Sequence, residues 1–368
     1  MKLHLFAYIL GWLYYTVTPV IIVYYNIFPE ITQNLNVPFW FVLSSALMFF
    51  SFAAGSISAQ YVRVTQLRMF NFPLKQQLYG SLIIILFFIF FVFYLDDIQV
   101  GYGGEADNKT GVLSTFMIVL CYYYMHFFLR YHFQSLCSIH LSIILAISVT
   151  FCGLLLVLSG GRLYLLTALL WIIFARLDLN YLKKRTVLIL LTLIISISIL
   201  VGQWRLGDDI SADNFMFYAF AEPLLLFFAI DDYFTLNEIQ MLNYNPDILM
   251  SLINLVPSII FPMKEQFYNT LSVQGVVNSP FGGLHVVISM LENFGLIGSL
   301  LISYLVGFII MKTYIVGQRN YTFLNLYYFL CAYSVFLYNR EAFSTQHKIL
   351  LVVLICSVLQ NKWIKKYV

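Results

Sequence analysis

The stretch VLSGGRLYLLTALLW (residues 157–171) decides how the middle of the chain folds. It lies in an apolar run from Ile139 to Ala175, and since ~20 residues already cross the hydrocarbon of a bilayer, the run must turn back on itself. The twin glycines Gly160 and Gly161 mark the corner, because glycine tolerates the positive φ values of a tight turn. The returning segment needs residues 159–162 to complete a crossing, which puts Arg162 at or inside the membrane boundary. An ionisable side chain at that depth marks a candidate functional site.

The composition places the chain among integral membrane proteins. Its residues are 61% hydrophobic and 10% charged, and its mean hydropathy is +0.85, whereas soluble domains carry about 25% charged residues. The net charge of +3 gives no sign of a nucleic-acid partner. The five cysteines form neither a disulfide framework nor a zinc-binding spacing. We therefore expect an all-α polytopic membrane protein, in contact with the lipid bilayer and without metal or cofactor.

Apolar runs predict about ten membrane-spanning helices. The runs lie at residues 5–25, 38–60, 78–95, 111–129, 139–158, 159–175, 186–202, 286–311, 321–338 and 347–361. With the N-terminus inside, 14 of the 20 lysines and arginines fall on the inner side, and every acidic residue except Asp178 falls outside. Because basic residues concentrate in cytoplasmic loops, both termini are predicted to be cytoplasmic.

Residues 203–285 are harder to assign. Two short apolar runs, 215–230 and 248–261, are separated by a connector without lysine or arginine, which does not suit a cytoplasmic loop. We expect one large external region with short interfacial or re-entrant helices. In the alternative, both runs cross and the protein has twelve spans. The predicted parts are an N-terminal bundle of about seven spans (1–202), the external region (203–285) and about three C-terminal spans (286–368).

Three arginines lie near the outer ends of predicted spans. Arg162 opens the sixth span, Arg205 closes the seventh and Arg340 closes the ninth. Guanidinium groups bind phosphate oxygens in a bidentate manner and keep their charge at any relevant pH. Together the three predict a site for a lipid diphosphate. The alternative is that each arginine pairs with a neighbouring acid or with lipid phosphate.

Two further residues are candidates for proton transfer. Glu222 precedes Pro223 in an apolar segment, and because proline suits the first position of a helix, Glu222 is predicted to cap a half-helix and to have a raised pKa or an arginine partner. His285 enters a predicted span after a glycine-rich loop, with Glu292 on roughly the same helical face. Histidine suits a general base near neutral pH. Helix capping for Glu222 and a structural role for His285 are the alternatives.

Two segments resemble a known family. LSGGRLYLL (158–166) is similar to the Ser-Gly-Ser-Arg hairpin of bacterial O-antigen polymerases, the Wzy family of repeat-unit polymerases. LHVVISMLENFGLIGSLL (284–301) resembles a segment that these proteins share with O-antigen ligases, in which a histidine precedes a Glu-x-Gly-x-x-Gly span. The order of the hairpin arginine, the second arginine, the large external loop and the histidine-led span also fits. The resemblance gives Gly160, Gly161 and Glu292 supporting roles.

This resemblance implies a GT-C-like membrane glycosyltransferase in the bacterial inner membrane. It would polymerise undecaprenyl-diphosphate-linked oligosaccharide repeat units, serving as donor and acceptor, into O-antigen or capsule-type polysaccharide on the outer face, alongside a chain-length regulator and a flippase. Arg162, Arg205 and Arg340 would bind the leaving diphosphate. His285, favoured over Glu222, would accept the acceptor's proton. An O-antigen ligase, a flippase or transporter of lipid-linked oligosaccharides and a non-catalytic assembly subunit are the alternatives.

Overall fold

The computed structural model describes most of the predicted helical segments. The described residues are 2–62, 70–71, 74–93, 106–134, 139–159, 162–183, 212–243, 284–340, 343–359 and 361–362, with scattered positions within 185–200 and 253–263. Their regular secondary structure is helical apart from one antiparallel pair of two-residue strands, β1 (Phe70–Asn71) and β2 (Asn361–Lys362). The all-α fold class is therefore confirmed.

Five of the described helices are long and apolar enough to cross a membrane, which confirms a membrane protein but is fewer than the ten spans predicted. They are Leu3–Tyr24, Phe39–Tyr61, Val112–Phe133, His140–Val157 and Val286–Gly317. Three other predicted spans form helices shorter than the ~20 residues of a full crossing. These are α8 (Arg162–Asp178), α14 (Tyr321–Val335) and α16 (Phe343–Leu359). The segment 186–202 is described only at scattered positions.

A proline shapes the first crossing. It consists of α1 (Leu3–Trp12), the π-helical turn η1 (Leu13–Val17) and α2 (Thr18–Tyr24). Pro19 has no N–H to donate to the Tyr15 carbonyl four residues earlier, and its ring crowds that carbonyl. The Thr18 hydroxyl donates to the Leu13 carbonyl at 2.9 Å. The wider π turn therefore accommodates the proline without ending the helix.

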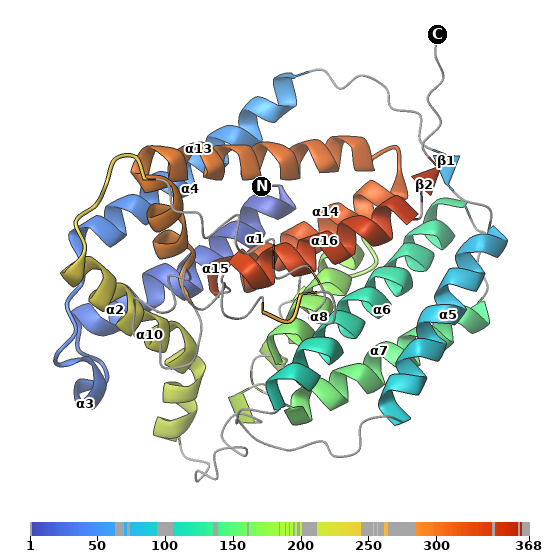
Figure 1. The fold of residues 1–368 in the computed structure, drawn as a ribbon, viewed down its shortest axis with the longest axis horizontal. Helices are drawn as coiled ribbons and strands as arrows, with labels where there is room; N and C mark the ends of the chain where they lie inside the picture. The colour runs from blue at the N-terminus through green and yellow to red at the C-terminus, as the bar shows by residue number, and fades with distance from the viewer. Residues whose placement is uncertain are drawn as a thin grey trace. The chain divides into compact units, whose positions relative to one another are not determined.

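The helices cluster by their contacts into two units, of which the first is Met1–Val62, Ile195–Met311 and Tyr333–Lys348. Its elements are α1, η1, α2, α3 (Pro29–Thr32), α4 (Phe39–Tyr61), α10 (Ala212–Leu236), most of α13 (Val286–Gly317) and α15 (Leu337–Arg340). α10 packs on η1, α2 and α4, and Figure 1 shows α10 beside α2. This packing places α10, from the middle of the chain, against the first crossing.

Small residues allow α4 and α13 to pack closely within this unit. A methyl group at Gly55 of α4 would overlap the carbonyl of Tyr304 on α13, and one at Gly307 of α13 would overlap the carbonyl of Phe52 on α4. The Ser58 hydroxyl also hydrogen-bonds the Tyr304 hydroxyl at 2.6 Å. Close approach through small residues, with hydroxyls bonded between helices, is typical of helix packing in membranes.

A glycine bends α13 near its start. Gly295 has φ +65°, a conformation that favours glycine, and Figure 1 shows the short first segment of α13 at an angle to the long second one. The bend exposes the N–H groups of Leu296 and Ile297, which donate to the carbonyls of Gln240 and Met241, each at 3.0 Å. The segment after α10 is thereby fixed against the bend.

The second unit is Arg63–Ile194, Lys312–Ala332 and Ile349–Val368. α6 (Ala106–Gln134) packs on α5 (Leu74–Phe93), α7 (Ile139–Ser159) and α8, and these four helices lie side by side in Figure 1. Within the apolar run that begins at Ile139, α7 ends at Ser159 and α8 begins at Arg162, whereas the predicted corner at Gly160 and Gly161 lies outside the described residues. A buried polar chain links three helices: the Trp171 indole donates to the Asn325 side chain, whose amide donates to the Tyr122 carbonyl, each at 3.1 Å.

The boundaries of the two units differ from those of the three parts predicted from the sequence, which are residues 1–202, 203–285 and 286–368. Each unit is built from three stretches that are separated in the sequence, so neither unit is one continuous range. Much of 203–285, including 244–252 and 264–283, lies outside the described residues. The assignment of that range to an external region stays a prediction, as does the twelve-span alternative.

Candidate functional site

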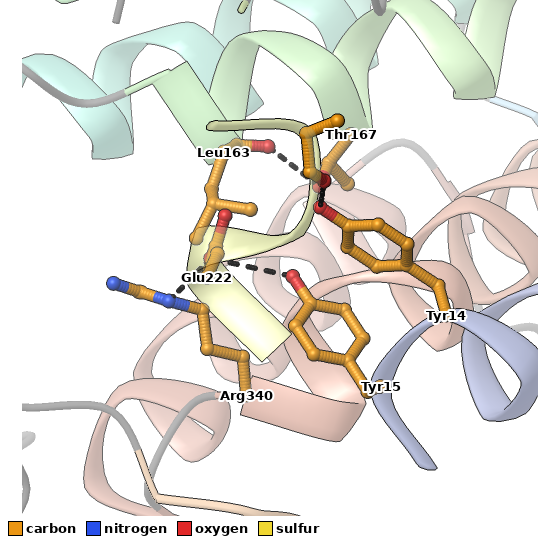
Figure 2. Close-up of polar contacts among 7 residues, drawn as sticks. Tyr14, Tyr15, Leu163, Thr167, Glu222 and Arg340 are labelled. Atoms are coloured by element: carbon orange, nitrogen blue, oxygen red, sulfur yellow. Dashed lines mark hydrogen bonds and ion pairs between the residues drawn. The ribbon is translucent and has the colours of Figure 1, made fainter. Parts of the chain in front are cut away.

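A partly exposed ion pair joins α10 and α15. The Arg340 Nε atom lies 2.6 Å from Glu222 Oε1, and the two side chains are 22% and 18% exposed. The Tyr15 hydroxyl donates to the same oxygen at 3.3 Å. Figure 2 shows the carboxylate between the arginine and the tyrosine, with the far end of the guanidinium pointing away from it. Glu222 therefore has the arginine partner that was predicted as one alternative, although the partner is distant in sequence.

Glu222 does not cap a half-helix, so that prediction is wrong. α10 continues through Pro223, although this proline cannot donate to the carbonyl of Ala219 four residues earlier. The Tyr14 hydroxyl donates to that carbonyl at 3.0 Å. Because a side chain of the first crossing satisfies the carbonyl that the proline leaves open, the helix can continue past it.

His285 is buried at the start of α13 and has 0% exposure. Its Nδ1 atom accepts the N–H of Val287 at 3.2 Å, as a helix-capping group does. Its Nε2 atom lies 3.3 Å from the Thr16 hydroxyl in η1. Burial lowers the pKa of His285 well below its ordinary value. A neutral ring with both nitrogens engaged suits a structural group better than a proton acceptor.

A backbone hydrogen bond connects this histidine to the ion pair. The N–H of Leu284, the residue before His285, donates to the carbonyl of Arg340 at 2.9 Å. Tyr15 and Thr16, adjacent in η1, contact Glu222 and His285 respectively. The π turn and the start of α13 together hold the ion pair in place.

Glu292 has a different neighbourhood. Its Oε2 atom accepts the Tyr233 hydroxyl at 3.1 Å, and its carbonyl accepts the Asn243 amide at 2.6 Å. It therefore supports the segment after α10.

The other predicted site residues cannot be placed to the same extent. Arg162 begins α8, but its side chain lies outside the described residues, as do Arg205, Gly160 and Gly161. The convergence of three arginines on one diphosphate therefore stays a prediction. Among the described residues, no cluster of histidine, cysteine and acidic side chains could hold a metal ion.

The sequence interpretation missed Tyr14, Tyr15 and Thr16. Three consecutive hydroxyl side chains followed by Pro19 within an apolar run are the signal that would have found them. A proline inside a membrane helix leaves a carbonyl that neighbouring helices or side chains must satisfy, so polar residues near it are candidates for contacts between helices.

Fold and site define a class: a polytopic helical membrane protein with an ion pair between helices distant in sequence. Comparison with protein-family models, curated proteins and solved structures finds no match for this chain.

Proposed function

We propose that the protein is a membrane glycosyltransferase that polymerises undecaprenyl-diphosphate-linked oligosaccharide repeat units on the outer face of the bacterial cytoplasmic membrane. The observation that carries the proposal is the partly exposed Arg340–Glu222 pair with Tyr15 on the same carboxylate oxygen. This arrangement combines an anion-binding group and a proton acceptor in one site. The substrate class comes from the resemblance of residues 158–166 and 284–301 to O-antigen polymerases.

The chemistry divides between these two side chains. A hydroxyl oxygen of the acceptor attacks the anomeric carbon of the donor sugar, and the bond from that carbon to the diphosphate breaks with its electron pair on the diphosphate. Arg340, with Arg162 and Arg205 as further candidates, stabilises the growing negative charge; one well-placed donor contributes about 3 kcal/mol. Glu222 accepts the acceptor's proton, a contribution of about 10²–10⁴-fold.

The ion pair also suggests how donor binding prepares the base. A carboxylate and a phosphate compete for the same guanidinium donors. A diphosphate that binds Arg340 would weaken the Glu222 contact and leave the carboxylate facing the acceptor, with Tyr15 maintaining its orientation. Base activation is thereby coupled to donor binding.

The proposal moves the base from His285 to Glu222. The histidine is fully buried and caps α13, whereas the carboxylate is partly exposed. His285 becomes a positioning residue that acts through Thr16, whose neighbour Tyr15 contacts Glu222.

The test is elongation of a purified lipid-linked repeat unit by the protein in nanodiscs, analysed as a ladder of products. We expect wild type to form a ladder, Glu222→Gln to lose at least 10²-fold in rate, and Arg340→Lys to be strongly impaired because lysine lacks the fork. Glu30→Gln and Arg319→Lys, at exposed positions, are matched controls that should behave as wild type. Single-unit products from wild type, or normal ladders from both site variants, would refute the proposal.

The same assay separates the two candidate bases. His285→Asn keeps a capping side chain and should retain most of the rate. The wild-type rate should stay flat as the pH falls through about 6.5, the ordinary pKa of histidine. A rate that drops there in wild type, together with an inactive but folded His285→Asn variant, would return the base to His285. In cells, loss of all surface polysaccharide on gene deletion would favour the ligase or flippase alternative.

A further inference from the structure

A pocket of about 570 Å³ lies in the first unit, between the start of α4 and the end of α10. Its lining includes Phe39, Trp40, Phe234, Asn237, Glu238 and Met241. The volume falls within the range of small-molecule sites, about 300–1,000 Å³. None of these residues takes part in the proposed transfer step.

One wall of the pocket is held by the bend of α13. The carbonyls of Gln240 and Met241 accept N–H groups from the residues after Gly295, and Asn243 donates to the Glu292 carbonyl at 2.6 Å. A side chain at Gly295 would meet the backbone of Leu242 and Asn243. The segment that resembles the family motif therefore builds this wall.

Further bonds hold the pocket in a defined shape. The Asn237 amide donates to the Tyr233 carbonyl at 3.0 Å, closing the end of α10. The Tyr233 hydroxyl is bonded to Glu292. A preformed pocket lowers the entropic cost of ligand binding.

The exposed groups of the pocket combine flat rings with polar atoms. Phe39 is 70% and Trp40 44% exposed, and their ring centroids are 5.8 Å apart at an angle of 67°. Glu238 is exposed and makes no hydrogen bond or ion pair with the described residues. The Trp40 indole N–H likewise has no acceptor among them. The pocket thus offers aromatic faces, one donor and one charged acceptor.

We infer that this pocket is a saccharide subsite that holds a sugar of the oligosaccharide chain away from the bond being formed. A pyranose ring presents polarised C–H groups on one face, which pack on the negative face of an aromatic ring. Its hydroxyls both donate and accept, so they match the Glu238 carboxylate and the Trp40 N–H. A lipid acyl chain would leave both polar groups unsatisfied. The inference rests on the proposed function for the kind of saccharide.

The experiment measures binding separately from polymerisation. The probe is the water-soluble oligosaccharide released by mild acid from the surface polysaccharide of the organism that encodes the chain, and its affinity for the protein in nanodiscs is read by saturation-transfer NMR. We expect Trp40→Ala to bind about tenfold more weakly than wild type, Glu238→Ala also to bind more weakly and Trp40→Phe to be intermediate. Phe50→Ala, at an exposed ring elsewhere on α4, is the control and should bind as wild type.

A second measurement tests lipid as the occupant. Brominated lipids in the nanodisc quench tryptophan that contacts acyl chains, and the difference in emission between wild type and Trp40→Phe isolates Trp40. We expect the brominated lipids to quench the Trp40 emission only slightly, and we expect this emission to change when the oligosaccharide is added. Strong quenching that the oligosaccharide does not relieve would overturn the saccharide subsite.

The outcomes separate the subsite from the proposed function. Oligosaccharide binding that depends on Trp40, without ladder formation by wild type, would keep the subsite and refute the polymerase. Ladder formation by wild type, with equal oligosaccharide binding by wild type and Trp40→Ala, would support the polymerase and refute the subsite. If wild type shows neither Trp40-dependent binding nor ladder formation, both the subsite and the polymerase are refuted.

Discussion

At the residue scale, two prolines explain how the site is assembled. Pro19 and Pro223 each leave one backbone carbonyl without its helical donor. The π turn η1 accommodates Pro19, and the Tyr14 hydroxyl of that turn donates to the carbonyl that Pro223 leaves open, on Ala219. Because an unsatisfied carbonyl in a membrane helix is costly, this replacement favours the packing of α10 on the first crossing, in which Glu222 meets Tyr15 and Arg340.

A double-mutant cycle tests this explanation. Tyr14→Phe should lower the free energy of unfolding by about 1–2 kcal/mol, since it leaves the Ala219 carbonyl without a donor. In a Pro223→Ala background the alanine N–H can bond that carbonyl, so the same substitution should cost distinctly less. Unfolding in mixed detergent measures both, and Tyr24→Phe, at a 74% exposed ring, is the control. Equal costs in the two backgrounds would contradict the replacement.

At the element scale, the α4–α13 contact depends on the absence of side chains. Gly55 and Gly307 each face a backbone carbonyl of the opposite helix, and the Ser51 hydroxyl donates to the Leu300 carbonyl at 2.6 Å in the same contact. Apolar burial contributes little to association between membrane helices, so close packing and hydrogen bonds hold such a pair together.

We expect Gly55→Ala and Gly307→Ala each to destabilise the protein by about 1–3 kcal/mol, because the added methyl groups force the backbones apart. Gly80→Ala in α5 is the matched control: the nearest atom to its added Cβ would be the Tyr123 hydroxyl at 3.8 Å, so alanine fits there. It should be neutral, or more stable by up to about 1 kcal/mol through helix propensity. The check is the unfolding midpoint in detergent; equal midpoints for all three variants would argue against close packing.

At the scale of the whole molecule, charge distribution predicts which residues face outward. Leu242, 70% exposed, belongs to the predicted external range, and Tyr181, 53% exposed, lies in a predicted cytoplasmic connection rich in basic residues. Four cysteines are buried, so only Cys137, outside the described residues, needs to be replaced for a clean background.

In intact spheroplasts, Leu242→Cys should react with an impermeant thiol reagent, whereas Tyr181→Cys should react only after permeabilisation. The reverse pattern would invert the orientation. If Leu242→Cys does not react in intact spheroplasts while Tyr181→Cys behaves as expected, the result would support the twelve-span alternative.

Local features of the sequence were read correctly. The helical, membrane-spanning character follows from apolar runs, which act within a few residues, and α7 and α8 are separate helices on either side of the twin glycines. The half-helix at Glu222 was wrong because the donor that replaces the missing N–H comes from Tyr14, far away in the chain. Among the described residues five helices are long and apolar enough to cross, fewer than the ten predicted, since an apolar run does not determine the length of the helix within it.

By itself, the sequence determined that this is a helical membrane protein, because transfer into a bilayer depends on the summed hydropathy of contiguous residues. Only the tertiary structure decided that Glu222 pairs with Arg340, that His285 is buried as a helix cap and that Glu292 supports a pocket wall. The physical reason is that ion pairs, burial and replaced hydrogen bonds depend on which distant helices pack together, and no local window of sequence contains that information.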